Sequence, residues 1–142
     1  MNIYTFKKAR RIFYPFSGVE AAERSKEAVN HYCFYKEIHL TEDFEDAILA
    51  LSARNMYRVY VNDEVVMHGP ARTAHGYCRV DEVDVTPYLQ KGVNHLAVEV
   101  MVYGDVYSGY SNDSTLETGM FIGELTVDGQ VISATGEDPW LT

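Results

Sequence analysis

The chain has 142 residues, of which 46% are hydrophobic and 23% charged, and its formal net charge at pH 7 is −9. This length suits one domain with a sizeable core and is short for two. The acidic balance repels phosphate backbones and argues against a nucleic-acid partner, and the apolar runs fall short of the roughly 18–20 residues that cross a bilayer, so no membrane contact is expected.

Residues 1–30 are expected to form an irregular segment that packs on the domain. The apolar run Ile12–Phe16 follows a basic cluster, but it is shorter than the hydrophobic region of a secretory signal, about 7–15 residues. We therefore expect a cytoplasmic location. Residues 17–30 have weak helical character, because they contain few large apolar side chains for a core-facing stripe.

From residue 31 the sequence indicates β structure. Residues 31–40 alternate apolar and polar side chains with a period of two, although Lys36 interrupts the apolar face. An acidic turn follows over residues 41–46, and residues 46–53 resume the alternation. Two strands joined by a short turn are the expected result.

The stretch from Ala53 to Arg72 predicts a β-hairpin. Residues 57–61 alternate strictly, and Asn62-Asp63 can close a two-residue turn because both residues tolerate positive φ. The returning strand ends in a Gly-Pro corner, where proline fixes the local φ and presents Arg72 from a stiff position.

The second half of the chain continues in the same way. We expect Thr86 to cap a single helical turn with Pro87 at its first position. A long polar loop is expected over residues 104–118, and Asp128-Gly129 is a strong turn signal. Further strands are expected over residues 77–85, 95–103, 119–127 and 130–134.

Short alternating strands with turns at near-regular spacing predict an all-β fold. We expect an antiparallel two-sheet β-sandwich of jelly-roll type, with residues 1–142 forming a single domain.

Several motifs occur in a fixed order along nearly the whole chain. Their order resembles the N-terminal, galactose-binding-like β-sandwich of alpha-L-rhamnosidase-type glycoside hydrolases, with Asp63 in place of the glycine usual at the hairpin turn. The motifs are residues 9–15, 32–40 and 53–72, Asp84-Val85-Thr86 with Lys91-Gly92-Val93-Asn94, residues 119–125 and Asp138-Pro139-Trp140.

The resemblance implies an accessory domain without catalytic residues of its own. Such a domain would support a glycoside hydrolase catalytic domain that lies outside these 142 residues, so the partners would be the catalytic and other domains of the same hydrolase. The chain would then be a piece of a longer hydrolase, or a short reading frame that keeps only this domain. An autonomous carbohydrate-binding module is the alternative.

The residues themselves predict no catalytic, cofactor-binding or metal-binding set. The five histidines lack the spacing of zinc ligands, and no G-x-S-x-G or phosphate-binding glycine motif occurs. A calcium ion at Asp105, Asn112 and Asp113 is conceivable, but a plain polar loop is the favoured interpretation there.

The remaining acidic residues and the two cysteines also receive structural interpretations. The acidic groups at Asp81–Asp84 and in the 42–46 turn are expected on the solvated surface. Glu99 and Glu124 are expected to face solvent or a neighbouring domain. Cys33 and Cys78 are too few for a disulfide framework and are expected as buried free thiols.

Four residues are candidates for contact with carbohydrate or with a partner domain: Arg72, Tyr77, Tyr107 and Tyr110. A guanidinium can clamp a carboxylate or sugar hydroxyls, and tyrosine rings can stack on sugars. The alternatives are an internal ion pair between Arg72 and the 81–84 acidic run, and packing of the tyrosines at the rim of the sandwich.

Overall fold

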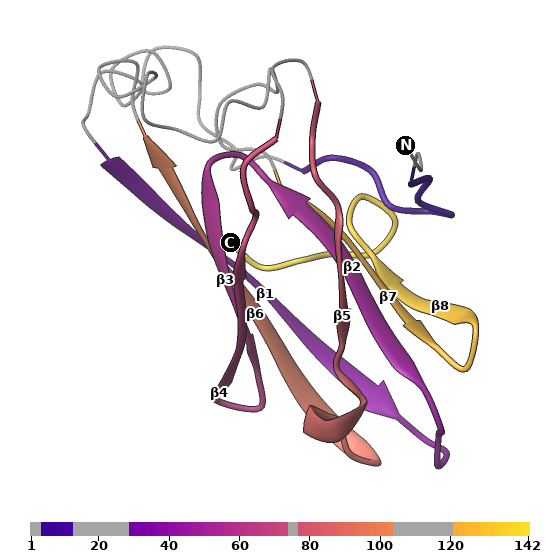
Figure 1. Cartoon of the computed structure of the whole chain (residues 1–142). Helices are drawn as coiled ribbons and strands as arrows, with labels where there is room; N and C mark the ends of the chain where they lie inside the picture. Colours follow the sequence, from indigo (N-terminus) through magenta and orange to yellow (C-terminus); the bar gives the residue numbers. More distant parts are fainter. Residues whose placement is uncertain (1–3, 13–28, 74–76, 104–120) are drawn as a thin grey trace.

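The computed structural model of the chain describes residues 4–12, 29–73, 77–103 and 121–142, which form two antiparallel four-stranded sheets packed face to face (Figure 1). This confirms the predicted two-sheet β-sandwich. The first sheet has the order β1-β6-β3-β4 and the second has β5-β2-β7-β8. The elements are β1 (Val29–Leu40), β2 (Ala47–Ala53), β3 (Met56–Val61), β4 (Glu64–Gly69), β5 (Asp81–Asp84), the 3₁₀ turn η1 (Thr86–Tyr88), β6 (Gly92–Tyr103), β7 (Phe121–Val127) and β8 (Gln130–Ala134).

The core lies between the sheets and follows the period-two pattern of the sequence. On β6 every second side chain turns inward, from Leu96 to Val102, and each of these is at most 2% exposed. The two sheets meet at Phe34 of β1 and Phe121 of β7, whose ring centroids are 5.0 Å apart. Stacked sheets interdigitate their inner side chains in this way, so the interior is filled.

Both predicted hairpin turns are present. Asn62 and Asp63 have φ values of 48° and 69°, and Asp128 and Gly129 have 46° and 77°, as two-residue turns with positive φ at both positions require. The Asn62 amide also donates to the backbone carbonyl of Tyr88 at 2.8 Å and accepts from the amide of His95 at 2.8 Å. The turn residue therefore ties the hairpin to η1 and to β6.

Two local predictions were wrong. The strand expected over residues 77–85 is shorter: β5 spans Asp81–Asp84, and its pairing with β2 runs from Ile48–Asp84 to Leu51–Asp81. The second concerns the expected cap Thr86: the N-cap residue of η1 is Val85, and no side chain makes a capping hydrogen bond there. The Thr86 hydroxyl instead accepts from the Ala47 amide at 2.9 Å, which fastens the turn to β2.

The described N-terminal residues, 4–12, lie along the second sheet. Ile12 bridges to Phe121, and the backbone amides of Lys7, Lys8 and Ala9 donate to the carboxylate of Glu124 at 3.3, 2.6 and 3.1 Å. Glu124 is 1% exposed, so the expectation that it faces solvent or a neighbouring domain was wrong. A buried carboxylate needs such donors, because burial without them is costly.

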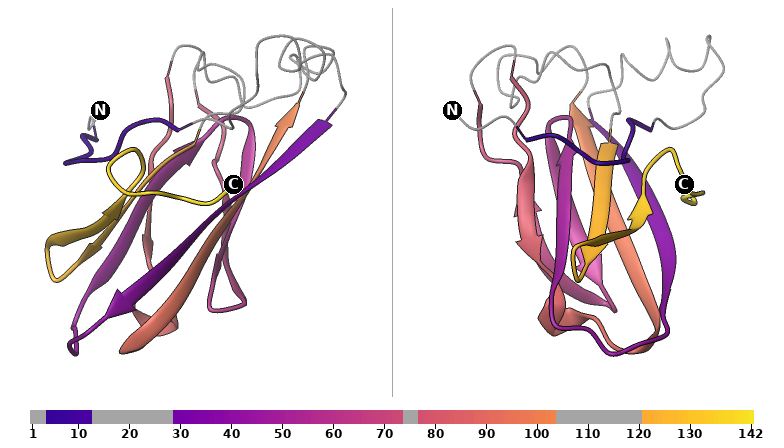
Figure 2. Two further views of the ribbon diagram at one scale, coloured as in Figure 1. Left: turned by 180° about the vertical axis from the view of Figure 1, so that it is seen from behind. Right: turned by 90° about the vertical axis from the view of Figure 1, so that its right-hand side faces the viewer.

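The C-terminal segment crosses from the second sheet to the first (Figure 2). After β8 it reaches β1, where Tyr35 and Leu141 exchange two backbone hydrogen bonds of 2.8 and 2.9 Å. Trp140 lies just before this bridge, with its ring centroid 5.4 Å from that of Phe121. The segment therefore spans one side of the sandwich.

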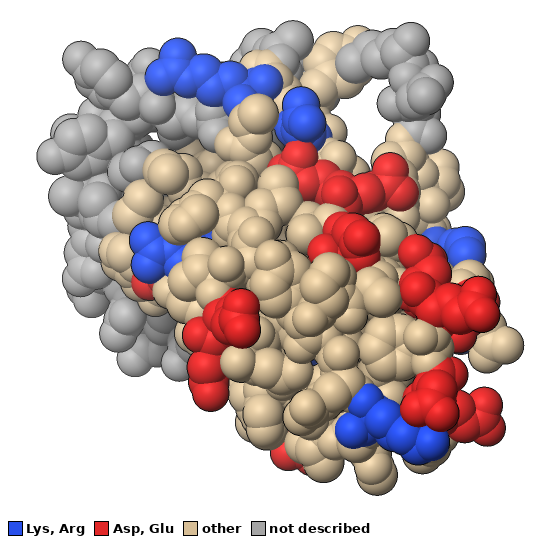
Figure 3. All heavy atoms as spheres, turned by 60° about the horizontal axis from the view of Figure 1, so that its bottom comes forward, with Lys and Arg blue, Asp and Glu red and all other residues tan. Residues whose placement is uncertain are grey.

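Acidic side chains predominate on the face that Figure 3 brings forward, in keeping with the net charge of −9. The acidic turn residues Glu42, Asp43, Glu45 and Asp46 are all exposed, as expected. In the described part of the chain, no helix has the length and apolar character needed to span a membrane.

Candidate functional site

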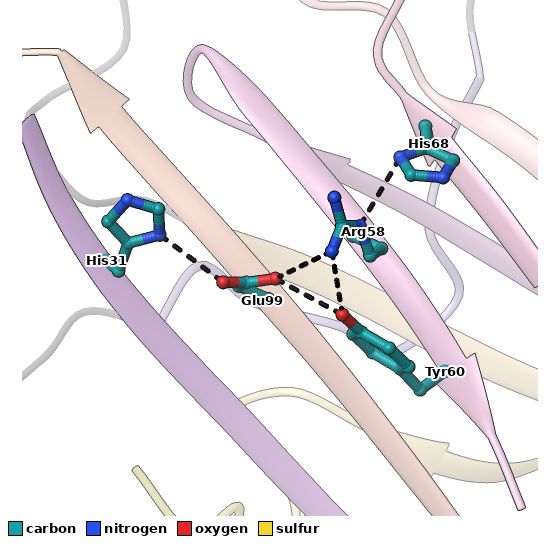
Figure 4. A network of polar contacts seen from close by, with 5 residues as sticks. All are labelled: His31, Arg58, Tyr60, His68 and Glu99. Atoms are coloured by element: carbon teal, nitrogen blue, oxygen red, sulfur yellow. Dashed lines mark hydrogen bonds and ion pairs between the residues drawn. The ribbon is translucent and has the colours of Figure 1, made fainter. Parts of the chain in front are cut away.

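The outer face of the first sheet carries a group of polar side chains from all four of its strands. We call this group the Glu99 cluster; its members are His31, Arg58, Tyr60, His68 and Glu99 (Figure 4). The sheet register assembles it, because Arg58 is opposite Glu99 on β6 and opposite His68 on β4. Directly paired residues on one sheet face have neighbouring side chains.

Glu99 is the centre of the cluster. One of its oxygens is 3.3 Å from Nδ1 of His31, and the other accepts from the Tyr60 hydroxyl at 3.4 Å and lies 3.8 Å from Nη1 of Arg58. Arg58 also donates to Tyr60 at 3.1 Å, which raises the pKa of its guanidinium, and to Nδ1 of His68 at 3.5 Å. The arginine therefore remains charged at any physiological pH.

An open hollow of about 240 Å³ lies beside the cluster. Two thioethers, from Met56 and Met101, contribute an apolar part to its lining, and His31, Arg58, His68 and Glu99 contribute polar groups. Its volume is below the range of about 300–1,000 Å³ that is typical of pockets for drug-sized ligands. The hollow has room for a small polar group that needs both donors and acceptors.

The contacts within the cluster are longer than two ion pairs elsewhere in the protein. Arg79 lies 2.6 Å from Asp81, and Lys36 lies 2.8 Å from Asp138, whereas the cluster contacts range from 3.1 to 3.8 Å. Short charge-assisted bonds are the strong ones. The Glu99 cluster is thus a loosely coupled group whose members retain capacity for other partners.

The pair formed by Tyr57 and Asp81 is structural. The Tyr57 hydroxyl donates to Asp81 at 2.5 Å, and burial, followed by this hydrogen bond, raises the pKa of Tyr57 strongly. Asp81 is 5% exposed, so its expected place on the solvated surface was wrong, whereas Glu82 and Asp84 are exposed as expected. Gly69 lies directly against the Tyr57 hydroxyl, where a Cβ atom would clash.

The predicted contact residues lie apart from the Glu99 cluster. Arg72 and Tyr77 are both exposed on the connection between β4 and β5. Within the described ranges Asp81 is paired with Arg79, and no ion pair joins Arg72 to the 81–84 run. Tyr107 and Tyr110, like the conceivable calcium ligands Asp105, Asn112 and Asp113, lie outside the described residues.

Both cysteines are exposed, so the expectation of buried thiols was wrong. Cys33 lies on the outer face of β1, opposite Glu99, and partial burial together with that carboxylate raises the pKa of its thiol. Cys78 lies with its Sγ atom 2.6 Å from the Ser52 hydroxyl. Cys33 lies on the surface of β1, and Cys78 lies on the surface of the connection between β4 and β5. No group of three or more potential metal ligands occurs among the residues that the structure describes.

Sequence reasoning did not identify the Glu99 cluster. The alternation along residues 95–103 placed Glu99 and Met101 on the outer face, and the same pattern placed Arg58 outward on its strand. What was missing is the pairing of the strands, since β1 contacts β6 across more than 50 residues of sequence. Register of this kind cannot be deduced from periodicity alone.

No protein-family model and no curated protein matches the sequence. Solved structures do match its fold. A GH78 family rhamnosidase of Bacillus sp. GL1 is 24% identical with a TM-score of 0.60, over 81% of this chain and 12% of that enzyme. The alpha-L-rhamnosidase of Streptomyces avermitilis, solved in complex with L-rhamnose, is 23% identical with a TM-score of 0.59, over 93% and 12%. The alpha-L-rhamnosidase of Dictyoglumus thermophilum is 16% identical with a TM-score of 0.51, over 80% and 12%.

These matches define the class of protein by fold: a β-sandwich that resembles one part of alpha-L-rhamnosidases. The chain spans 12% of the length of each of these three enzymes. The resemblance seen in the order of sequence motifs is thereby confirmed at the level of the fold.

Proposed function

We propose that this chain is a non-catalytic accessory domain that supports and orients a glycoside hydrolase catalytic domain of the alpha-L-rhamnosidase type. The observation that supports the proposal is the unequal coverage of the structural matches. Between 80% and 93% of this chain corresponds to 12% of each rhamnosidase chain described above. A nearly whole fold that corresponds to so small a part of an enzyme suits a supporting domain.

The packing of the sandwich is consistent with a supporting role. Its interior is filled by side chains such as Leu49, Val98 and Leu125, each at most 1% exposed. The two buried carboxylates in the described ranges, Asp81 and Glu124, are engaged by Tyr57 with Arg79 and by the N-terminal backbone. Glycoside hydrolysis needs two carboxyl groups free to act across a scissile bond, and these two are committed to structural contacts.

The proposal is tested with the purified chain and an aryl alpha-L-rhamnoside. We expect no turnover above the buffer blank, because the proposed role supplies no acid–base pair. Turnover that a single carboxylate substitution abolishes, for example Glu99→Gln, would show that the chain is an enzyme. The Glu64→Gln variant, which changes an exposed carboxylate of β4, is the matched control.

A second candidate function is autonomous carbohydrate binding, and the hollow beside the Glu99 cluster favours it. A carboxylate and a guanidinium in one hollow can accept from and donate to sugar hydroxyls. Arg72, Tyr77, Tyr107 and Tyr110 remain proposed contacts for the same function. Calorimetry with rhamnose- and galactose-containing glycans separates the two functions, because the accessory role predicts no saturable heat for the isolated chain.

A further inference from the structure

The four edge strands of the two sheets differ in how open they are to a further strand. β5 has four residues and β8 has five, and the pairing of β8 with β7 is interrupted by a register shift. β4 has six residues, and its pairing with β3 is also interrupted. β1, in contrast, has twelve residues in unbroken register with β6. Short strands and bulges protect an edge from added strands, and a long regular edge lacks that protection.

The backbone groups that face the open side of β1 follow from its bridge to the C-terminal segment. The amide and carbonyl of Tyr35 both bond to Leu141, so they point away from β6. In a regular antiparallel strand, alternate residues direct both backbone groups to the same side. His31, Cys33 and Glu37 therefore also present their amides and carbonyls to the open edge.

The C-terminal segment occupies only part of this edge. Lys36 donates to the carbonyl of Pro139 at 3.0 Å and forms an ion pair with Asp138. These contacts hold the segment next to the part of β1 that follows Tyr35. On the other side of the bridge, no backbone partner for His31 or Cys33 is found among the described residues. The segment runs antiparallel to β1, so this open stretch lies directly ahead of Thr142. Figure 2 shows the C-terminal segment arriving at β1.

We propose that the β1 edge at His31–Cys33 receives an additional antiparallel strand from the hydrolase polypeptide that this domain accompanies. The inference rests on the proposed accessory function and names the surface through which it acts. Strand addition to a sheet edge is an established way of binding an extended polypeptide through its backbone. A strand at this position lies in line with Pro139–Leu141 and continues the same added strand.

The geometry favours the hydrolase polypeptide over a second copy of this chain. A two-fold pairing of β1 with β1 would centre on the long edge, where Leu141 already bonds to Tyr35. A polypeptide that continues from Thr142 in a longer protein would enter the open stretch without changing direction. A separate segment of the hydrolase could enter in the same orientation.

The test measures amide hydrogen exchange in peptides that cover residues 29–35. It compares the chain of 142 residues with the same chain in the presence of the hydrolase polypeptide encoded with it, whether in one reading frame or in two. We expect exchange at His31 and Cys33 to be fast in the isolated chain and about 100-fold slower with the hydrolase, as new hydrogen bonds require. Unchanged exchange would overturn the inference.

A backbone substitution gives an independent readout. The substitution Cys33→Pro removes the backbone N–H of residue 33. This N–H points to the open edge and not to β6, so the pairing of β1 with β6 is retained. We expect Cys33→Pro to weaken association with the hydrolase by about tenfold, because one hydrogen bond to the added strand is lost and an adjacent one is disturbed. We expect Cys33→Ala, which keeps the N–H, to leave the affinity unchanged. Equal affinities of the two variants would contradict the inference. If Cys33→Pro does not fold, the exchange measurement decides.

Failure of this inference differs from failure of the proposed function. If the hydrolase changes the melting temperature of the chain but not the exchange of His31 and Cys33, the accessory role stands and the docking edge is wrong. If the hydrolase has no effect on either, both fail. Protection at these residues that rises with the concentration of the chain alone would assign the edge to a second copy and overturn the inference.

Discussion

Glu124 and Asp81 show how this fold accommodates charge in its interior. Each of these residues is at most 5% exposed. The carboxylate of each accepts hydrogen bonds from a part of the chain outside its own strand. Glu124 accepts from three successive backbone amides of the N-terminal segment, whereas Asp81 accepts from a buried tyrosine and a partly exposed arginine. A buried carboxylate whose oxygens accept hydrogen bonds from another segment anchors that segment. A buried carboxylate without such donors would destabilise the fold.

Glu124→Ala tests the first of these anchors. The substitution leaves the amides of Lys7, Lys8 and Ala9 without their acceptor, so we expect the free energy of unfolding to fall by about 3 kcal/mol. Chemical denaturation measures it. Glu64→Ala removes an exposed carboxylate and is expected to change stability by less than about 0.5 kcal/mol. Equal effects of the two substitutions would show that residues 4–12 do not depend on Glu124.

Lys36→Met tests the ion pair with Asp138. Burial alone would raise the pKa of Asp138, but hydrogen bonds from Lys36, Ser133 and Ala134 outweigh it and lower the pKa. A lowered pKa stabilises the fold above the unfolded value of about 3.9, and that contribution is lost as the pH falls through the folded value. We expect Lys36→Met to cost about 1 kcal/mol at pH 7 and progressively less below pH 4 or so.

The control for this prediction is another lysine–aspartate pair. Lys91 and Asp43 are 3.5 Å apart with side chains 55% and 90% exposed, so Lys91→Met is expected to change stability by less than about 0.5 kcal/mol. Thermal unfolding followed between pH 3 and pH 7 compares the two variants. A Lys36→Met deficit that does not shrink at low pH would contradict the assignment to Asp138.

At the residue scale, periodicity predicted which side chains turn inward but not what the polar ones contact. Leu96 and its alternate neighbours on β6 are buried as expected, because a strand with one packed face follows a period of two. The partners of Glu124 are 115 to 117 residues away in sequence. A contact of that range depends on the path of the N-terminal segment, which has no periodic signal.

At the scale of elements, the hairpin turns are locally encoded. Asn62-Asp63 and Asp128-Gly129 adopt positive φ at both central residues, and their residue types predicted it. The strand expected over residues 77–85 is shorter for a non-local reason, because a strand needs a paired neighbour and the pairing with β2 stops at Leu51–Asp81. The Glu99 cluster was missed for a similar reason, since it needs the register of four strands.

Asp63→Gly tests the energetics of the first hairpin. Asp63 has a φ of 69°, a conformation that glycine adopts without a steric penalty from Cβ. We expect the substitution to stabilise the domain by about 0.5 kcal/mol, measured by chemical denaturation. Gly129→Ala, at a φ of 77° in the second hairpin, is expected to destabilise it by about 1 kcal/mol. Effects of the opposite sign would show that these turns relax in solution.

At the scale of the whole molecule, the two ends of the chain complete the sandwich. Residues 4–12 cover part of the second sheet, and residues 135–142 connect the second sheet to β1. Among the described residues, part of the β1 edge has no backbone partner, and a polar hollow lies on the outer face of the first sheet. The edge is the docking surface proposed for the accessory role, and the hollow is the feature that favours carbohydrate binding.

The most direct test of that role compares the hydrolase polypeptide with and without these 142 residues. The melting temperature and the kcat for an aryl alpha-L-rhamnoside are measured for both forms. We predict that removing the domain lowers the melting temperature by several degrees and leaves kcat of the folded enzyme within about twofold, because the domain supports the enzyme without taking part in bond cleavage. An unchanged melting temperature, or a kcat abolished in a form that remains folded, would contradict the account.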